Sequence, residues 1–236
     1  MSKNGIIPDD RGFVIGHGSA NGFREEWLDE AGAGIPEAII GLERDKAARG
    51  FPVVGFLGRL CRQKGLETLA VAWPAIREHF PEARLLIVGP WEREDAVSDS
   101  YRRRLEGDSS VIIPGAVEQW GMGQCYRLMD VFLLPSIGSE GMPNTLLESA
   151  LYGVPAVTSD VVGCIDAVVD GVTGQIVPPG NVDALVRATV TYLRDPALAK
   201  FHGNLGRDRV LKDFRPEPIW DRLLDEYCVL NSRDKL

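Results

Sequence analysis

The chain has 236 residues, of which 44% are hydrophobic and 25% charged, and its formal net charge is -8. This length allows one large domain or two small ones, and the composition is that of an ordinary globular protein. The acidic balance disfavours nucleic acid as the main partner, because binding to phosphates needs a basic face. The sequence shows neither an apolar run of transmembrane length nor a signal-peptide core near its start, so we expect a cytoplasmic protein.

The cysteines and histidines do not form a recognisable ligand set. The four cysteines are widely spaced, without a C-x-x-C pair, and the sequence predicts reduced thiols. The three histidines do not cluster either. Since a protein metal site usually needs three or four converging ligands, no metal site is expected.

The first fifty residues predict little regular structure. Residues 1–12 are crowded with glycine, proline and aspartate and are interpreted as a tail or linker. A short strand is expected at 13–16, followed by a turn-rich loop at 17–22. Short helical pieces are expected between 23 and 50, including one near 36–48.

From Phe51 onward, apolar runs typical of buried strands alternate with helical patterns. The strands are expected at 53–57, 84–89, 110–114, 131–134, 154–158 and 174–177. The helices are expected at 66–80, in the second part of 92–106, and at 118–129, 145–152, 182–193, 196–213 and 219–230. Pro74 lies within the first of these helices and is expected to kink or shorten it.

This alternation predicts an α/β fold with a doubly wound parallel sheet, because fully apolar strands suit a sheet that is covered on both faces. Ligands of such folds bind beyond the carboxyl ends of the strands. The glycine-bearing loops after strands 53–57, 85–88 and 131–134 should therefore line the binding edge.

A basic loop, Gly58–Gly65 with the sequence GRLCRQKG, follows the first regular strand. Arg59 and Lys64 could reach a diphosphate, arginine through its bidentate fork and lysine as a point charge. The loop is neither a Walker motif nor a G-x-G-x-x-G fingerprint. The alternative interpretation is an ordinary solvated basic loop.

An acidic strand–turn–helix segment, Ser139–Ser149 with the sequence SEGMPNTLLES, follows strand 131–134. The chain turns at Gly141, and Pro143 suits the first turn of the next helix, where a missing N–H costs nothing. Glu140 and Glu148 could both face one cleft and accept hydrogen bonds from hydroxyls of a sugar or ribose. The alternative is a helix-start carboxylate favoured by the dipole, plus a surface charge.

The two loops together favour a nucleotide-sugar site, with cations for the diphosphate and carboxylates for the hydroxyls. A third region, made of 170–174 and 177–181, is rich in glycine and proline and is interpreted as turn structure. Within it, Asn181 is expected to cap the following helix.

These segments also suggest a family. In the order GRLCRQKG, LLIVGP, IIPGAV, DVFLLPSIGSEGMPNTLLESALYGVPAVTSDVVG and VVDGVTGQIVPPGN, they resemble the carboxyl-terminal half of the retaining glycosyltransferases of family 4, which have the GT-B fold with Rossmann-like domains. The resemblance runs from Phe13 to Phe214, and IGHGSANG is similar to the family's hinge-proximal segment. Bacterial members that build polysaccharide or glycan chains on lipid carriers are the most similar type.

The resemblance implies a role for each matching residue. Arg59 and Lys64 would hold the donor diphosphate, Glu140 would contact the donor sugar and Glu148 the ribose. Catalysis would depend on Glu140, Arg59 and Lys64, retain anomeric configuration and need no metal or other cofactor, since the two cations neutralise the leaving diphosphate. The further expected contacts are backbone N–H groups around Gly141, Met142 and Asn144 for the sugar, those of Thr145 and Leu146 for the distal phosphate, and backbone near 88–90 and 114–117 for the base.

The resemblance also implies a domain organisation. Residues 1–12 would be the remnant of a missing amino-terminal domain, 13–214 the donor-binding domain, and 215–236 a carboxyl-terminal crossover helix. The missing domain would supply the acceptor site, so the isolated chain is expected to be inactive. The apolar face of the final helix (Ile219, Trp220, Leu223, Tyr227) would be exposed, self-associate or fold onto this domain.

The resulting prediction is a binding domain for a UDP-sugar or another nucleotide-sugar, from a glycosyltransferase that moves a hexosyl group to a glycan or lipid-linked acceptor. The full enzyme would then touch the membrane peripherally through its acceptor. Two alternatives remain open at this point. One is a catalytically incomplete interaction module that needs a partner domain, and the other is a fragment of a sugar-nucleotide epimerase with the same fold.

Overall fold

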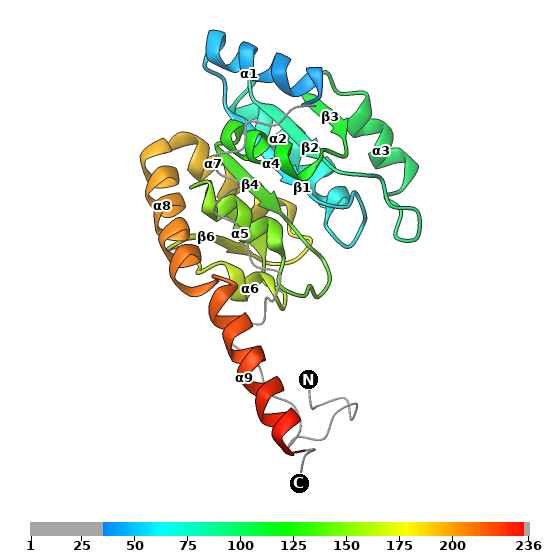
Figure 1. Cartoon of the computed structure of the whole chain (residues 1–236). Helices are drawn as coiled ribbons and strands as arrows, with labels where there is room; N and C mark the ends of the chain where they lie inside the picture. Colours follow the sequence, from blue (N-terminus) through cyan, green and yellow to red (C-terminus); the bar gives the residue numbers. More distant parts are fainter. Residues whose placement is uncertain (1–34, 234–236) are drawn as a thin grey trace.

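The computed structural model describes residues 35–233, and for 119, 120 and 229–233 the backbone alone. The expected tail at 1–12, the strand at 13–16 and the loop at 17–22 lie outside the described residues. The described part is a single layered α/β arrangement from which the last helix projects (Figure 1). Within it, no helix is long and apolar enough to cross a membrane.

One sheet of six parallel strands forms the centre, in the order β3-β2-β1-β4-β5-β6. This is the doubly wound parallel sheet that the sequence predicts, with every strand within two residues of its expected place. The strands are β1 (Val53–Leu57), β2 (Arg84–Val88), β3 (Val111–Gly115), β4 (Val131–Leu134), β5 (Ala156–Ser159) and β6 (Gly174–Val177).

Helices follow the strands as expected, with one addition, the four-residue helix α6. They are α1 (Glu37–Arg49), α2 (Leu66–His79), α3 (Asp99–Glu106), α4 (Gln119–Leu128), α5 (Asn144–Leu151), α6 (Cys164–Ala167), α7 (Val182–Arg194), α8 (Pro196–Asp213) and α9 (Glu217–Arg233). Pro74 does not shorten α2, which continues to His79 with Trp73 and Ile76 buried on either side of the proline. Burial of that face keeps the helix going although one backbone hydrogen bond is lost.

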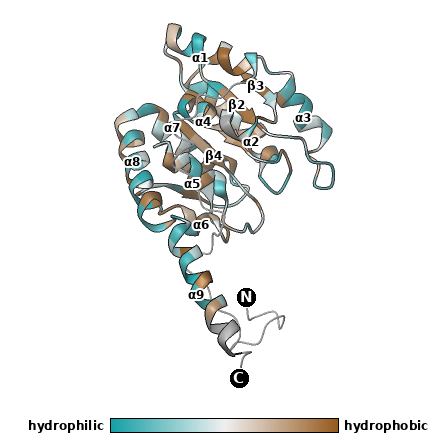
Figure 2. Ribbon diagram, viewed as in Figure 1, coloured by the Kyte–Doolittle hydropathy of each residue, from teal (hydrophilic) through white to brown (hydrophobic). Residues whose placement is uncertain are grey.

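The core lies on both faces of the sheet. All residues of β1 and β4 are buried, as parallel strands covered by helices require. Helix α2 packs against α3 and α7, and α5 packs against α6 and α8. Figure 2 shows the same arrangement: apolar strands lie in the centre, and the surrounding helices have polar residues on their outer faces. All four cysteines are free thiols, and three of them are buried.

The strand order reverses next to β1. From β1 the chain moves outward through β2 to β3, and then returns to place β4 on the other side of β1. Connections that leave in opposite directions open a crevice between the two carboxyl ends, which is where such sheets bind ligands. The loops that follow β1 and β4 are the basic and the acidic segments singled out above.

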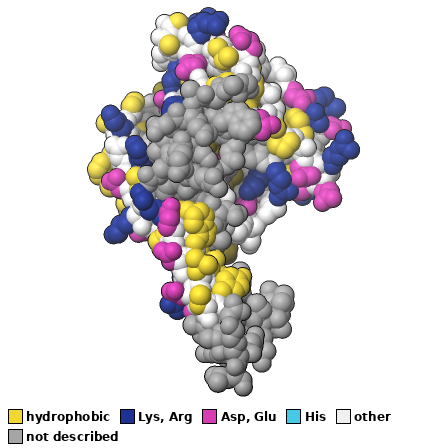
Figure 3. All heavy atoms as spheres, in the orientation of Figure 1, with side chains coloured by type: hydrophobic (Ala, Val, Ile, Leu, Met, Phe, Trp, Pro, Cys, Tyr) yellow, Lys and Arg dark blue, Asp and Glu magenta, His cyan; other side chains and the backbone are white. Residues whose placement is uncertain are grey.

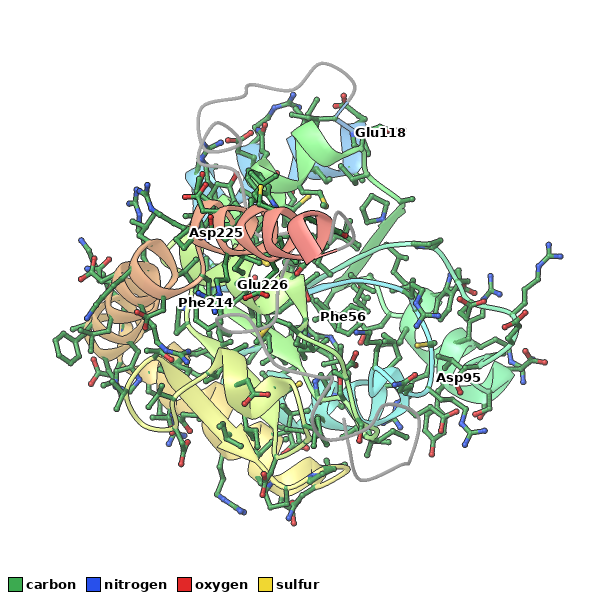
Figure 4. The ribbon with its side chains drawn as sticks, turned by 60° about the horizontal axis from the view of Figure 1, so that its bottom comes forward. Phe56, Asp95, Glu118, Phe214, Asp225 and Glu226 are labelled. Carbon is green, nitrogen blue, oxygen red and sulfur yellow. The ribbon has the colours of Figure 1, made fainter. Side chains whose placement is uncertain are left out.

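Helix α9 extends away from the layered part (Figure 1). Near its start Ile219 is buried, whereas Trp220, Leu224 and Tyr227 are exposed. Figure 3 shows hydrophobic side chains gathered along this helix, and Figure 4 labels Asp225 and Glu226 on it. The expected apolar face is thus partly exposed, with Ile219 buried, Leu223 half-buried, and Trp220 and Tyr227 exposed.

Candidate functional site

The basic and acidic loops meet at the reversal point of the sheet. Gln63 ties them together, since its carbonyl accepts from the amide of Ile137 at 2.8 Å and its side-chain amide donates to the carbonyl of Ser139 at 2.8 Å. Gly65 lets them approach, because a Cβ there would lie 1.9 Å from the carbonyl oxygen of Pro135 and its φ is 77°. The amide of Gln63 also donates to Asp95, which is labelled in Figure 4, at 2.6 Å.

Lys64 and Glu140 form the centre of this junction. The Lys64 Nζ donates to Oε2 of Glu140 at 2.7 Å, and the two side chains are 14% and 10% exposed. The other carboxylate oxygen, Oε1, accepts from the hydroxyl of Ser136 at 2.8 Å. Both oxygens of Glu140 therefore have a donor, one charged and one neutral. Sequence reasoning had placed Lys64 with the diphosphate and Glu140 with the sugar, and had not anticipated this contact between them.

The backbone around Glu140 is fixed from a third loop. The amide of Glu140 donates to the carbonyl of Val162 at 3.0 Å. Gly163 has a φ of 87°, and a Cβ on it would lie 1.8 Å from the carbonyl oxygen of Gly141. The segment before α6, after β5, thus packs directly on the turn that carries Glu140.

Arg59 lies at the exposed rim of the site. Its Nη1 donates to Oε2 of Glu92 at 3.0 Å, and its side chain is 58% exposed. The hydrogen bond to Glu92 raises the pKa of Arg59. The pKa of Glu92 is lowered, first by the backbone amide of Arg93 and then by Arg59. Glu92 was not among the predicted site residues, since it lies in a charged loop without a recognisable motif.

Glu148 lies within α5 in a different environment. The hydroxyl of Tyr126, on α4, donates to Oε2 of Glu148 at 2.8 Å. Burial raises the pKa of Glu148, and the hydrogen bond from Tyr126 works against that rise. Burial also raises the pKa of Tyr126, whose ring stacks on Tyr152 with the ring centres 5.5 Å apart. Tyr126 is a second site residue without a sequence signal, because it comes from a helix two elements earlier.

The start of α5 differs by one position from the expectation. Pro143 is the residue before the first helical one, with extended backbone angles, and its side chain offers no cap. The amide of Leu146 donates to the carbonyl of Pro143 at 3.0 Å, so one of the two predicted phosphate donors already has a backbone acceptor. Met142 packs against the core and Gly141 is exposed. The remaining amides of the first turn belong to Asn144 and Thr145.

The glycine- and proline-rich stretches 170–173 and 178–181 form turns on either side of β6, as expected. Asp170 accepts from the amide of Ile176 at 2.8 Å, and Thr173 accepts from the amide of Val169 at 2.9 Å. The Asn181 side chain caps α7 by accepting from the amide of Ala184 at 3.0 Å.

A cavity of about 540 Å³ lies elsewhere, at the amino-terminal edge of the sheet. Phe51, Met129 and Tyr192 contribute to its wall, and none of the predicted site residues does. Its charged pair, Lys46 and Asp130, is joined at 2.6 Å. The chemistry-bearing residues gather at the opposite edge, where two cations, Arg59 and Lys64, and two carboxylates, Glu140 and Glu148, surround the end of β1 and β4.

A family model for the group 1 glycosyl transferases matches residues 51–195, more than half of the chain. The chain belongs to this family. A group 1 relative, the capsular polysaccharide biosynthesis glycosyltransferase CapM of Staphylococcus aureus, is 30% identical over 214 residues, which are 91% of this chain and 54% of that protein. The chain therefore spans about half the length of the curated relatives it matches.

Solved structures share the fold of this group 1 domain. The carboxyl-terminal domain of the group 1 protein LpcC from Francisella tularensis superposes with a TM-score of 0.63 at 18% identity, covering 73% of this chain and 92% of that one. HepE of Anabaena, solved with UDP and glucose, superposes with a TM-score of 0.73 at 18% identity, covering 92% of this chain and 62% of that one. The described residues thus have the architecture of the carboxyl-terminal domain of GT-B glycosyltransferases.

Proposed function

We propose that this chain binds the nucleotide-sugar donor of a retaining glycosyltransferase, with a UDP-sugar as the donor. The observation that carries the proposal is the meeting of Lys64 and Glu140 at the reversal point of the sheet, 2.7 Å apart and nearly enclosed. A cation and a carboxylate held together there match the two chemistries of such a donor, which are the diphosphate and the sugar hydroxyls. The similarity in fold to HepE, which was solved with UDP and glucose, supports the same class of ligand.

The diphosphate binds between Arg59 and Lys64. Both cations are paired with carboxylates in the free chain, at 3.0 and 2.7 Å, so the donor exchanges those partners for phosphate oxygens. Arginine and lysine suit this exchange because each keeps its charge whichever anion it meets. The first turn of α5 contributes the amides of Asn144 and Thr145, which point toward bound anions at the start of a helix.

The two glutamates bind the two sugar units of the donor. Glu140 accepts from hydroxyls of the transferred sugar, beside Gly141 and Met142. Glu148 accepts from the ribose through the carboxylate oxygen that Tyr126 leaves available, since Tyr126 donates to Oε2. The base lies against the backbone that follows β2 and β3.

Transfer itself uses charge neutralisation at the leaving diphosphate by Arg59 and Lys64, where preorganised cations lower the barrier most. The acceptor binds on the side of Glu140 that faces away from β4. Because the chain spans about half of its relatives, we assign the acceptor site to a second domain, on a longer chain or on a separate one. The 236-residue chain by itself is then expected to bind donor and not to transfer it.

The binding assignment is tested by isothermal titration calorimetry with UDP, GDP, ADP and a panel of UDP-sugars. We expect UDP and at least one UDP-sugar to bind, with GDP and ADP weaker. Arg59→Ala should weaken UDP about tenfold, the usual effect of losing one charged hydrogen-bond donor. Arg187→Ala, which removes an exposed arginine of α7, is the matched control and should leave affinity unchanged.

Absence of binding at millimolar nucleotide would reject the proposed function. Tighter binding of GDP than of UDP would change the proposed base from uracil to guanine and leave the proposed sites for diphosphate and sugar in place. Unchanged UDP affinity in Arg59→Ala would remove that residue from the diphosphate site.

A further inference from the structure

We propose that Ser136 is a positioning residue that holds Glu140 in place once the donor has bound, and so sets the affinity for the sugar rather than for the nucleotide. This inference rests on the proposed function, because it assigns Glu140 to the transferred sugar. It concerns a residue that precedes the acidic segment and whose importance only the folded chain reveals.

The geometry gives Ser136 a single clear contact. It follows β4 by two residues and is completely buried. Its hydroxyl donates to Oε1 of Glu140 at 2.8 Å, the length of a strong hydrogen bond to a carboxylate. A buried donor of this kind has no water to replace its partner, so the contact persists while Glu140 stays where it is.

The two groups that donate hydrogen bonds to Glu140 behave differently when the nucleotide-sugar binds. Lys64 is drawn to the diphosphate, which carries more negative charge than one carboxylate. Ser136 has no charge and stays beneath Glu140. In the loaded site, the direction of the carboxylate toward the sugar therefore depends on Ser136, whereas in the free site Lys64 shares that task.

The surroundings of Ser136 keep its hydroxyl in one direction. Cys164, at the start of α6, is buried with its thiol beside the hydroxyls of Ser136 and Thr158. The Thr158 hydroxyl donates to the carbonyl of Leu134 at 2.8 Å and is thereby occupied. The carboxylate oxygen Oε1 of Glu140 is thus the strongest acceptor available to Ser136.

A matched control exists on the neighbouring strand. Ser159 ends β5, is completely buried like Ser136, and its hydroxyl has no hydrogen-bond partner in the part of the chain that the structure describes. Removing either hydroxyl deletes one buried oxygen near the carboxyl edge of the sheet. Only the removal at Ser136 takes a donor from Glu140.

The test compares UDP with the UDP-sugar that binds the wild-type chain most tightly among UDP-glucose, UDP-galactose and UDP-N-acetylglucosamine. Calorimetry on the 236-residue chain should show a five- to tenfold loss of UDP-sugar affinity in Ser136→Ala and less than a twofold loss for UDP. This range corresponds to one hydrogen bond to a charged group, about 1 to 1.4 kcal/mol. Ser136→Cys retains a weak hydrogen-bond donor, so its UDP-sugar affinity should lie between those of the wild-type chain and Ser136→Ala.

Ser159→Ala should leave both affinities unchanged, and circular dichroism shows whether each variant is folded. If Ser136→Ala does not fold, Ser136→Cys carries the comparison by itself. An equal loss for UDP and UDP-sugar, no loss at all, or the same loss in Ser159→Ala would overturn the role of Ser136. A wild-type chain that binds UDP but no UDP-sugar also overturns it, while one that binds neither rejects the proposed function as well.

Discussion

Glu140 and Glu148 stand eight residues apart in one motif, yet the fold treats them in opposite ways. Glu140 lies on a turn and meets a cation, Lys64, together with the hydroxyl of Ser136. Glu148 lies inside α5, where the neutral hydroxyl of Tyr126 donates to it. The first carboxylate is paired with a cation, whereas burial raises the pKa of the second.

The difference shows that a glutamate in a binding site can be held either with a paired cation or without one. A compensated carboxylate is stable while the site is empty, and it becomes a free acceptor only after its cation has moved to another anion. An uncompensated one has a raised pKa and gains when a ligand brings further donors. In the proposed function, sugar binding at Glu140 is thereby coupled to diphosphate binding, while ribose binding at Glu148 is not.

The largest expected effect comes from removing the cation that pairs with Glu140. Lys64→Met leaves the carboxylate of Glu140 almost enclosed without its cation, which should lower the free energy of unfolding by about 3 kcal/mol. Urea denaturation measures the loss. Adding Glu140→Gln should recover most of it, because no charge is then left unpaired. A double variant as unstable as Lys64→Met would show that the lysine acts through packing alone.

The next effect separates the ligands of the two glutamates. Glu148→Gln should weaken UDP about tenfold, since an amide offers one acceptor oxygen in place of a charged pair. UDP and 2′,3′-dideoxy-UDP should then bind with similar affinity, although the wild-type chain distinguishes them. Glu140→Gln is the matched control, expected to weaken the UDP-sugar without weakening UDP, because Lys64 no longer has a charged partner to leave. A reversal of these two patterns would exchange the assignments.

A smaller effect is expected from the neutral partner. Tyr126→Phe removes the hydrogen bond that lowers the pKa of Glu148, so burial should raise that pKa further. Ribose hydroxyls need the ionised carboxylate, and UDP affinity therefore falls as the pH drops through this pKa. Calorimetry between pH 5 and 8 should place the fall at higher pH in Tyr126→Phe, with about threefold weaker UDP at neutral pH. Coincident pH profiles would contradict the link.

The smallest effect concerns a compensated pair at the surface. Arg59 and Glu92 are joined at 3.0 Å, but solvent reaches the arginine freely. Glu92→Gln should release Arg59 for the diphosphate and strengthen UDP by no more than about twofold, because exposed ion pairs contribute little. Repeating the titration at higher salt should remove the gain. A weaker affinity would mean that Glu92 orients Arg59 instead of competing for it.

Local pattern sufficed to predict most of the fold. The strands are short apolar runs and the helices show a clear periodicity, so β1 to β6 and α2 to α9 occur close to their expected places. The exception is α6, which has four residues and is too short for a helical periodicity of apolar residues to be visible in the sequence. Pro74 was expected to kink or shorten α2; the helix is not shortened, because burial of Trp73 and Ile76 outweighs the loss of one hydrogen bond.

The candidate site was predictable only in part. Parallel topology brings the loops after β1 and β4 to one edge, which is why Arg59, Lys64 and Glu140 could be grouped from the sequence. The hydrogen-bond partners of the site residues could not be predicted from the sequence. Tyr126 reaches Glu148 from α4, and Glu92 reaches Arg59 from the loop after β2; both contacts depend on how distant elements pack, for which a single sequence holds no signal.

Two glycines, Gly141 in the acidic segment and Gly163 in the loop that packs on it, have opposite consequences for protein engineering. Gly163 has no room for change, because any Cβ would collide with the carbonyl oxygen of Gly141 at 1.8 Å and displace the whole turn. Gly141 has open space, with nothing within 4 Å of an added Cβ. A library intended to alter which sugar the domain accepts should hold position 163 constant and randomise position 141, where new side chains can enter the site without unfolding it.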